Sequence, residues 1–183
     1  MVPPNVEAGS FAELEIQARA ICGRWLTVVE RSDSLDPQMV YVGIGKMKRM
    51  VMNRLVIPLG AELVDGGETL KVWIETPVGN KITHASLVGK ETFDADGDLG
   101  DWTAKSYVTD YAWIKFCNGK EFRALQMQRE NPKLGTAFET KAVLPDNEFG
   151  KILLYNITIQ PPAGSSQSTI SVDRVYKYEG PIA

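Results

Sequence analysis

The most constraining feature of this sequence is a series of short stretches, rich in β-branched and aromatic residues, that begins at Leu55. Turn residues separate these stretches about every eight to twelve positions, which is typical of a β-meander that forms a barrel or a sandwich. The turns are DGGE at 65–68, PVGN at 77–80, DADGDLGD at 94–101 and CNGK at 117–120. The pair Asn118 and Gly119 is the most specific, because both residues tolerate the positive φ of a tight hairpin.

The spacing of the turns predicts about ten strands. The first covers 23–31, where Trp, Thr and Val are frequent, and a second run starts at Leu55. We expect the later strands at 69–76, 81–87, 90–94, 102–109, 111–116, 121–129, 151–160 and 168–178. Residues 130–150 are less regular, and we expect an insertion there.

A helix is predicted before the first strand. Ser10 is followed three residues later by Glu13, which is a capping box and places the helix start near Phe11. Apolar residues at helical spacing then form one stripe, made of Phe11, Leu14, Ala18 and Ile21. We therefore divide the chain into an N-terminal extension, 1–22, with one helix, and a β-domain, 23–183.

A second helical region follows the first strand. Between Leu35 and Arg54 the chain has Pro37 near its start, glycines at 43 and 45, and then a methionine-rich pattern. This arrangement predicts two short helices joined at the glycines.

Charge and composition exclude several classes of function. The 183 residues carry a net charge of −3, whereas affinity for nucleic acid comes from clustered Lys and Arg, so nucleic acid is a poor candidate partner. No stretch approaches the apolar length of a membrane span, and the start MVPPNVEAGS lacks the features of a signal peptide. We therefore expect a cytoplasmic protein.

The sequence offers no metal or cofactor motif. Cys22 and Cys117 have no metal-ligand spacing, and His84 is the single histidine, so we expect two free thiols, no metal and no cofactor. Residues 94–101 place aspartates at alternate positions, as a calcium loop does. However, Leu99 stands where an EF-hand needs glycine and Lys105 where it needs glutamate, which favours a solvated turn.

Four segments carry a resemblance to a known family. They are GRWLTVVERSDSLDPQMVYVGIG at 23–45, GKETFDADG at 89–97, KFCNGKEFRALQMQRE at 115–130 and DRVYKYE at 173–179. Together they resemble the intracellular fatty-acid-binding proteins, a branch of the calycin barrels, from about Gly23 to Glu179. The resemblance implies an all-β, ten-stranded antiparallel up-and-down barrel, with a two-helix lid after the first strand and an extra N-terminal helix.

The last strand contains the first candidate site. By strand alternation, Val172, Arg174, Tyr176 and Tyr178 share one face. From this segment alone, an edge or barrel strand whose arginine reaches solvent is the simpler interpretation; a strand that faces an anion-binding cavity is the alternative. The family resemblance favours the cavity, because it implies that Arg174 and Tyr176 bind a fatty-acid carboxylate.

A second arginine usually completes that site in the family, one strand earlier. Aligning the hairpin at 118–120 with the family places Gln126 at that position, with Phe122, Ala124 and Gln128 on the same face. Arg123 and Arg129 then face the other way, and would point inward only if the register slipped by one residue. The glutamine is also compatible with a neutral head group.

The helix pair contains the second group of candidates. The resemblance implies that it forms a lid over the barrel mouth, carried by Val40, Tyr41, Met47, Met50 and Val51. Methionine suits such a mobile contact because its side chain is flexible, although these residues also fit the core side of an ordinary helical hairpin. Basic residues beside them could touch an anionic membrane transiently, or form a solvated face: Lys46, Lys48, Arg49 and Arg54.

The sequence therefore predicts a monomer that binds a fatty acid, or a similar small hydrophobic ligand, without covalent chemistry. Two alternatives remain open. A calycin-like barrel enzyme, acting on an apolar substrate or pigment, could use His84, Tyr107, Asp110 and Tyr111, although their spacing does not bring them together. The N-terminal helix and residues 130–150 could instead form a protein-interaction module.

Overall fold

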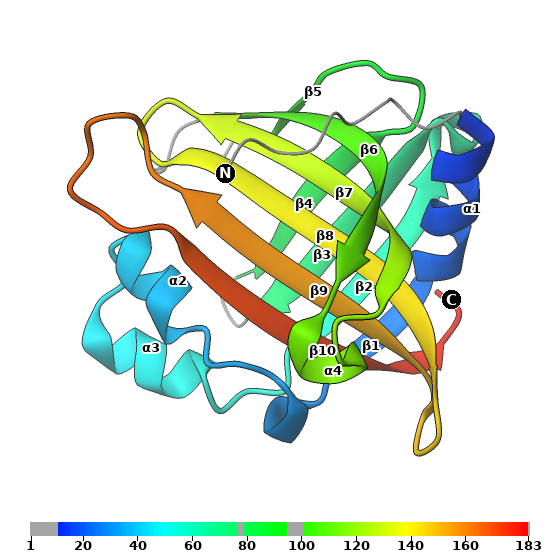
Figure 1. Cartoon of the computed structure of the whole chain (residues 1–183), viewed down its shortest axis with the longest axis horizontal. Coiled ribbons are helices and arrows are strands. Elements are labelled where there is room, and N and C mark those ends of the chain that lie inside the picture. Colours follow the sequence, from blue (N-terminus) through cyan, green and yellow to red (C-terminus); the bar gives the residue numbers. More distant parts are fainter. Residues whose placement is uncertain (1–10, 77–78, 95–100, 183) are drawn as a thin grey trace.

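Ten antiparallel strands form one curved sheet in the computed structural model, which describes residues 11–76, 79–94 and 101–182 (Figure 1). The strands are β1 (Gly23–Thr27), β2 (Pro58–Val64), β3 (Thr69–Thr76), β4 (Gly79–Ser86), β5 (Thr92–Asp94), β6 (Trp102–Ala112), β7 (Glu121–Asn131), β8 (Gly135–Asp146), β9 (Gly150–Gln160) and β10 (Ile170–Gly180). Strands that are consecutive in sequence pair with one another, except β4 and β5, which form the two edges of the sheet, and β1 also pairs with β10. The predicted up-and-down barrel is confirmed.

The barrel is nearly closed at the gap between β4 and β5. The described residues of these two strands form no backbone ladder, and hydrogen bonds that involve side chains join them instead. The backbone N–H of His84 donates to Asp94 Oδ2 over 3.2 Å, and His84 Nδ1 lies 2.9 Å from Asp94 Oδ1. Thr92 Oγ1 donates to the carbonyl oxygen of His84 over 2.7 Å. The single histidine therefore helps to join the two edges of the sheet.

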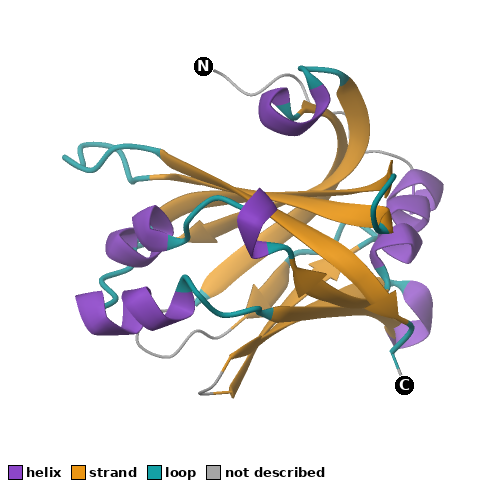
Figure 2. Ribbon diagram, turned by 90° about the horizontal axis from the view of Figure 1, so that it is seen from below, coloured by secondary structure: helices purple, strands orange, loops and turns teal. Residues whose placement is uncertain are grey.

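Helices cover the two ends of the barrel (Figure 2). The helix α1 (Phe11–Ile21) lies at one end, and α2 (Asp36–Tyr41) and α3 (Lys46–Met52) lie at the other. The short α4 (Ile114–Cys117) follows β6, and two 3-10 turns occupy Val29–Arg31 and Asp65–Gly67. The predicted helix pair after the first strand is confirmed, as is the helix that precedes it.

The N-terminal helix α1 packs its apolar stripe into the barrel. Leu14, Ala18 and Ile21 are buried in the same cluster as Trp25 of β1. The indole Nε1 of Trp25 donates to the carbonyl oxygen of Ile21 over 2.7 Å, which fixes the end of the helix to the first strand. Phe11, the remaining member of the predicted stripe, is exposed.

We predict that Leu14→Ala destabilises the protein by about 2–5 kcal/mol, because the substitution removes a buried side chain and leaves a cavity. Ile16→Ala is the matched control, since Ile16 lies on the same helix with 64% of its surface exposed. Urea unfolding followed by tryptophan fluorescence measures both variants. Equal losses in the two variants would show that α1 does not contribute through packing.

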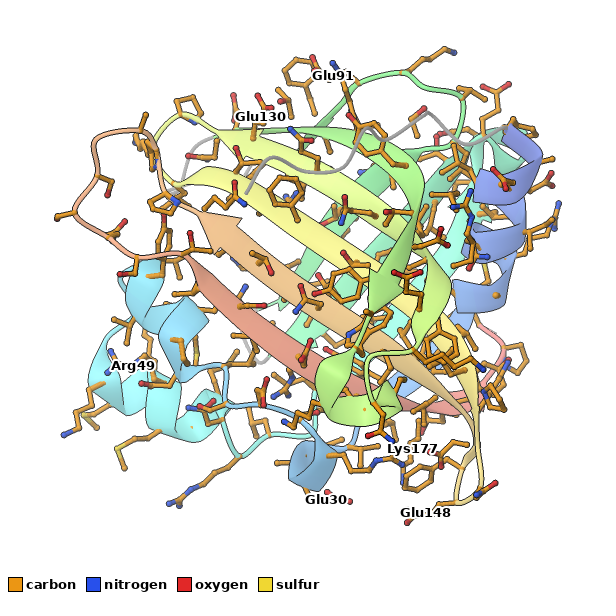
Figure 3. All side chains as sticks on the ribbon, in the orientation of Figure 1. Glu30, Arg49, Glu91, Glu130, Glu148 and Lys177 are labelled. Atoms are coloured by element: carbon orange, nitrogen blue, oxygen red, sulfur yellow. The ribbon has the colours of Figure 1, made fainter. Side chains whose placement is uncertain are left out.

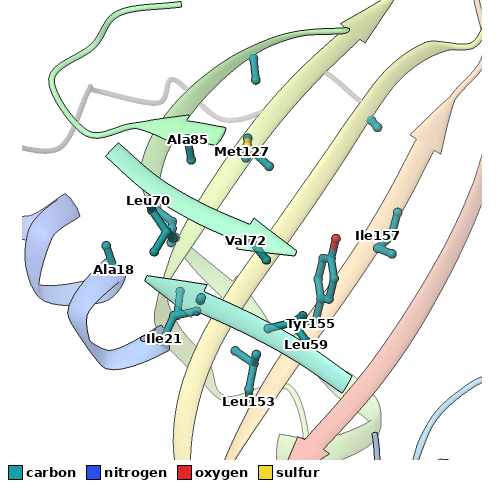
Figure 4. Close-up of a cluster of buried hydrophobic side chains, with 14 of the residues drawn as sticks. Ala18, Ile21, Leu59, Leu70, Val72, Ala85, Met127, Leu153, Tyr155 and Ile157 are labelled. Carbon is teal, nitrogen blue, oxygen red and sulfur yellow. The ribbon is translucent and has the colours of Figure 1, made fainter. Parts of the chain in front are cut away.

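Alternate residues of the strands fill the barrel interior, as strand geometry requires. Figure 4 shows side chains from both walls meeting beside α1, with Leu70 and Val72 of β3 facing Leu153 and Tyr155 of β9. All four are buried. The core therefore fills the end of the barrel covered by α1, which leaves the lid end for a cavity.

Two of the predicted strand assignments are wrong. Residues 130–150 are not irregular: β8 lies in the middle of the sheet, paired with β7 and β9. Its inward positions include Glu139 and Lys141, so the apolar alternation that marks a strand is broken. Conversely, 102–116 is one strand, β6, followed by α4, rather than two strands. The predicted number of ten is kept because these two errors offset each other.

A second apolar cluster covers the outer face of the sheet. Trp113, beside α4, packs with Val28, which follows β1, and with outward residues of the strands β7 to β10, namely Ala124, Ala142, Ile152, Leu154 and Val175. Strand β10 therefore has buried residues on both faces, with Val172, Arg174 and Tyr176 inward and Val175 outward. This explains why neither face of 171–178 resembles a solvent face in the sequence.

Candidate functional site

A cavity of about 220 Å³ lies inside the barrel, between the lid helices and the strands. Its apolar lining comes from the lid region and from the strands, with Leu35, Met39, Val42, Ile44, Met52, Ile57, Val72, Ile74, Ala137, Ile157 and Ile159. Polar side chains are concentrated on the strands β6 to β10, at Trp102, Arg129, Glu139, Tyr155, Arg174 and Tyr176. The cavity thus combines an apolar space with a polar wall, as ligand sites do.

Arg174 and Tyr176, the head-group residues predicted from the sequence, both line this cavity. Arg174 is 3% exposed, and its Nη1 donates to the carbonyl oxygen of Asp33 over 2.6 Å. Burial raises the pKa of the Tyr176 hydroxyl, and the neighbouring Arg174 guanidinium opposes that rise through its charge and a hydrogen bond. The two side chains therefore present donors side by side on β10.

Glu139, which the sequence pattern does not mark as a site residue, is the centre of a buried ionic network on the same wall. Its Oε1 accepts from Arg129 Nη1 over 2.9 Å. Its Oε2 accepts from Lys141 Nζ over 2.9 Å and from the Tyr155 hydroxyl over 2.6 Å. The carboxylate is thus bound by three donors from three neighbouring strands, β7, β8 and β9.

The network keeps Glu139 ionised. Burial by itself opposes ionisation, but the charges of Lys141 and Arg129 and the hydrogen bond from Tyr155 outweigh it, and the pKa of Glu139 falls to about 2. Burial lowers the pKa of Lys141, although the Glu139 carboxylate acts against that shift. The pKa of Tyr155 is raised by burial and by the adjacent carboxylate, so Tyr155 remains a donor.

Three cavity-lining residues have a buried N–H group without a hydrogen-bond partner in the described part of the chain. These groups are Trp102 Nε1, Arg129 Nε and Arg174 Nε. Arg129 also lies over the Trp102 ring, 4.7 Å from its centroid, so two of these groups belong to one contact pair. A buried donor without an acceptor costs about 1–3 kcal/mol, and all three need the same complement, an acceptor.

The predicted orientation of β7 is wrong by one residue. Leu125 and Met127 belong to the interior cluster and Arg129 lines the cavity, so these alternate positions face inward. Gln126 and Gln128 face outward; Gln126 Nε2 donates to Thr140 Oγ1 over 3.0 Å, and Gln128 Nε2 to Glu130 over 3.0 Å. The second arginine that lines the cavity is therefore Arg129.

Two features explain this error. A shift of one residue exchanges the two faces of a strand, and the alignment on 118–120 fixed the register six to ten residues before Gln126 and Gln128. In addition, Ala124 is buried by the outer cluster, so burial does not alternate cleanly along β7. The larger size of Leu125 and Met127 was the signal that could have identified the inner face. Phe122, also predicted as a ligand contact, shares the outward parity and does not line the cavity.

The lid residues are only partly as predicted. Tyr41 is buried, and its hydroxyl donates to the carbonyl oxygen of Leu134 over 2.8 Å, which ties α2 to the turn between β7 and β8. Four predicted lid residues are exposed and do not line the cavity, namely Val40, Met47, Met50 and Val51. Met52 is the residue of α3 that reaches the cavity, which the helical pattern did not distinguish from its neighbours.

The residues of the enzyme alternative are not brought together. His84 bonds to Asp94 in the gap between β4 and β5, and Asp110 lies 3.5 Å from Arg123 in an ion pair. Tyr107 and Tyr111 lie on the outer face of β6, opposite to the interior residue Val108. Among the described residues no group of acidic, histidine and cysteine side chains could hold a metal ion. Most of the predicted solvated turn at 94–101, namely residues 95–100, lies outside the described residues.

No family model and no curated protein matches the chain. Solved structures do. A structure described as the REP1-NXSQ fatty acid transporter is 15% identical, with a TM-score of 0.59 over 88% of this chain and 98% of its own. A Schistosoma mansoni fatty acid binding protein in complex with arachidonic acid is also 15% identical, with a TM-score of 0.58 over 90% of this chain and 99% of its own. The chain has the fatty-acid-binding-protein fold.

This fold does not by itself decide the function. A secretory abundant heat soluble protein from Ramazzottius varieornatus is 12% identical and also reaches a TM-score of 0.59, over 87% of this chain and 96% of its own. No described helix has the length and apolar character needed to span a membrane. The function of this fatty-acid-binding-protein-like chain is therefore argued from its cavity.

Proposed function

We propose that this chain binds and carries a fatty acid, or a similar small hydrophobic anion, inside its barrel without covalent chemistry. The observation that carries the proposal is the set of buried N–H donors without a partner among the described residues, on one wall of a mainly apolar cavity. Arg174 is the principal head-group residue, because its planar guanidinium matches a carboxylate and its Nε has no acceptor in the described part of the chain. Tyr176 adds a neighbouring donor, and Arg129 and Trp102 complete the wall.

The tail and the head group make different contributions. Each buried methylene contributes roughly 0.8 kcal/mol, whereas a hydrogen bond to a charged group contributes about 1.5–3 kcal/mol. The acyl chain therefore supplies most of the affinity and the head group supplies orientation and selectivity. After the costs of ordering the ligand, dissociation constants in the micromolar to nanomolar range are expected, which correspond to about −8 to −12 kcal/mol.

The proposal is tested on the native protein. Gentle purification, native mass spectrometry and organic extraction should identify a stoichiometric hydrophobic anion, and displacement of a fluorescent fatty acid should give its affinity. The matched alcohol should bind more weakly than the fatty acid. A protein that carries no lipid and takes up neither fluorescent fatty acid nor alcohol would reject the proposal.

Particular residues favour a ligand carrier over the two alternatives, a barrel enzyme and a protein-interaction module. The helix α1 buries Leu14, Ala18 and Ile21 in the barrel of its own chain, and β8 belongs to the sheet, so neither feature is left over for a partner protein. The enzyme alternative is not supported, because His84 and Asp110 are engaged in separate contacts and Tyr107 and Tyr111 lie on the outer face of β6. We keep the division into an extension, 1–22, and a barrel, 23–183, and the assignments as a monomeric, cytoplasmic carrier without a cofactor, as parts of the proposal.

We further propose that the exposed face of the lid contacts membranes during ligand transfer. Val40, Met47, Met50 and Val51 are exposed there, with Met47 at 84%, and the basic residues Lys46 and Lys48 lie on the same helix pair. Apolar side chains that insert at the interface and Lys side chains that attract anionic lipids act together in this position.

For this surface we predict that Met47→Ser with Val51→Ser slows transfer of a fluorescent fatty acid to phosphatidylserine vesicles by several-fold, because the double variant removes apolar contact area. Equilibrium binding of the fatty acid should not change, since neither residue lines the cavity. Phe93→Ser is the control: Phe93 is exposed on β5, away from the lid. Transfer rates that stay equal in all three proteins would exclude contact through this face.

A further inference from the structure

The buried charges on the polar wall do not cancel. Arg129, Lys141 and Arg174 are cationic, and all three side chains are buried or nearly so. The nearby buried anions are Glu139 and Asp94, whose carboxylate oxygen lies 4.0 Å from Arg129 Nη2. Three positive charges against two negative ones leave an excess of one. A buried charge is costly unless it is paired, so this excess calls for one further negative charge.

Other charged groups near the cavity do not alter this count. Lys81 also lines the cavity but is exposed, and solvent weakens the field of an exposed charge. Asp33 accepts from Arg174 through its carbonyl oxygen, whereas its carboxylate, 38% exposed, pairs with Lys115 and is affected less by the charge of Arg174. Arg174 itself forms no ion pair among the described residues, which identifies it as the cation in excess.

Glu139 divides the polar wall into an occupied part and an open part. Its carboxylate holds Arg129 Nη1 and Lys141 Nζ at 2.9 Å each, so these two donors are taken before any ligand enters. The open part comprises Arg174 and the unpartnered N–H groups of Arg129 and Trp102. A ligand with a second negative charge would need the donors of Arg129 and Lys141. Glu139 already binds these donors, so its carboxylate takes the place of that second charge.

We infer that Glu139 determines head-group selectivity: it limits the cavity to ligands with a single negative charge, and excludes dianionic head groups such as a phosphate monoester. This inference rests on the proposed function, since it concerns the ligand of the same cavity. Loss of the Glu139 charge would raise the excess to two positive charges and favour a dianion. Loss of the Lys141 charge would reduce the excess to zero and favour a neutral head group.

The test compares three amphiphiles of equal chain length, namely a fatty acid, an alkyl phosphate and an alcohol, by competition with a fluorescent probe at pH 8. The alkyl phosphate is then a dianion, because its second pKa is about 6. Wild type should prefer the fatty acid. Glu139→Gln should shift the ratio of the two affinities towards the alkyl phosphate by about tenfold or more, and the shift should shrink at pH 5, where the phosphate becomes a monoanion.

A second substitution keeps the inference testable if Glu139→Gln folds poorly. Lys141→Met should weaken the fatty acid relative to the alcohol by about tenfold, and the double variant Glu139→Gln with Lys141→Met should return to the wild-type preference, because its charge excess is again one. Glu148→Gln is the matched control, since Glu148 is exposed in the turn between β8 and β9, far from the polar wall (Figure 3).

The outcomes separate the two proposals. If wild type binds none of the three amphiphiles, the proposed function fails and the inference fails with it. If wild type binds the fatty acid but the affinity ratios stay equal in Glu139→Gln, Lys141→Met and the double variant, the proposed function stands and the selectivity role of Glu139 is rejected. A shift in the ratio for Glu148→Gln as large as for Glu139→Gln would also reject that role.

Discussion

Arg174→Met should weaken the binding of a long-chain fatty acid by about ten- to a hundredfold, with a much smaller effect on the matched alcohol. The guanidinium is 3% exposed, lines the cavity and has an Nε–H without an acceptor among the described residues. Hydrogen bonds to a charged group contribute about 1.5–3 kcal/mol, and about 1.4 kcal/mol corresponds to a factor of ten in affinity. Methionine retains most of the side-chain volume, so the loss reports charge rather than a cavity.

The control for this experiment is Arg123→Met. Arg123 lies near the start of β7, has 43% of its side chain exposed and pairs with Glu13 and Asp110. It does not line the cavity, so its loss should leave both affinities unchanged. Isothermal titration of the two ligands against wild type and both variants gives the comparison. Equal losses of the acid and the alcohol in Arg174→Met would exclude ion pairing and reduce Arg174 to a packing residue.

The stability of Arg174→Met gives an independent check. A buried cation without an ion pair opposes folding, and its replacement by an apolar side chain of similar volume is often neutral or stabilising. The hydrogen bond to the carbonyl oxygen of Asp33 is lost in exchange. Without ligand, the variant should therefore melt at or above the wild-type temperature, and with fatty acid the order should reverse.

The course of the strands was predictable from the sequence because turn residues act locally. Asn118 and Gly119 both have positive φ, as their residue types predict, but they follow α4 and do not form a tight hairpin between two strands. The helix pair begins after Leu35, as the proline and glycines indicated. Where interior positions are apolar, as along β9, local pattern and strand agree. The exception, β8, places Glu139 and Lys141 inside the barrel, and a strand with charged interior residues has no apolar period to detect.

The site was less predictable because it depends on the register of strands that are distant in sequence. Arg174 and Tyr176 could be placed on one face, since alternation within β10 needs no partner strand. The direction of Arg129 could not be predicted, because a shift of β7 by one residue reverses it. Residues on the outer face of β7 are also buried, so burial does not reveal the correct register. The pairing of Arg129 with Glu139 joins β7 to β8, and no local pattern marks such a contact.

Glu139→Gln should destabilise the protein at pH 7 by about 3–5 kcal/mol, because it leaves the buried Lys141 without its anion. Glu148→Gln, an exposed carboxylate in the turn that follows β8, should change the free energy of unfolding by less than about 0.5 kcal/mol. Chemical denaturation across a range of pH measures both variants. Adding Lys141→Met to Glu139→Gln should recover most of the loss, since the unpaired cation is then removed.

The pH dependence distinguishes the ionic role of Glu139 from a role in packing. Its pKa of about 2 in the folded protein lies below the ordinary value of a glutamate, so its contribution is fully present above about pH 5 and is lost as the pH falls towards 2. A shift of this size corresponds to about 3 kcal/mol. Wild type and Glu148→Gln should therefore lose stability over this range more steeply than Glu139→Gln, while Asp33 and Asp146, whose pKa values are also lowered, act equally in all three.

At alkaline pH we expect the opposite order: stability should change more steeply with pH in Glu139→Gln than in wild type. Burial lowers the pKa of Lys141 in the folded protein, so the folded state binds fewer protons than the unfolded state and stability rises as the pH approaches the ordinary lysine value. Loss of the Glu139 carboxylate removes the charge that opposes this shift, so Glu139→Gln should gain more stability than wild type between neutral pH and about pH 10. Parallel curves for the two proteins from pH 2 to pH 10 would mean that Glu139 stabilises the barrel by shape alone.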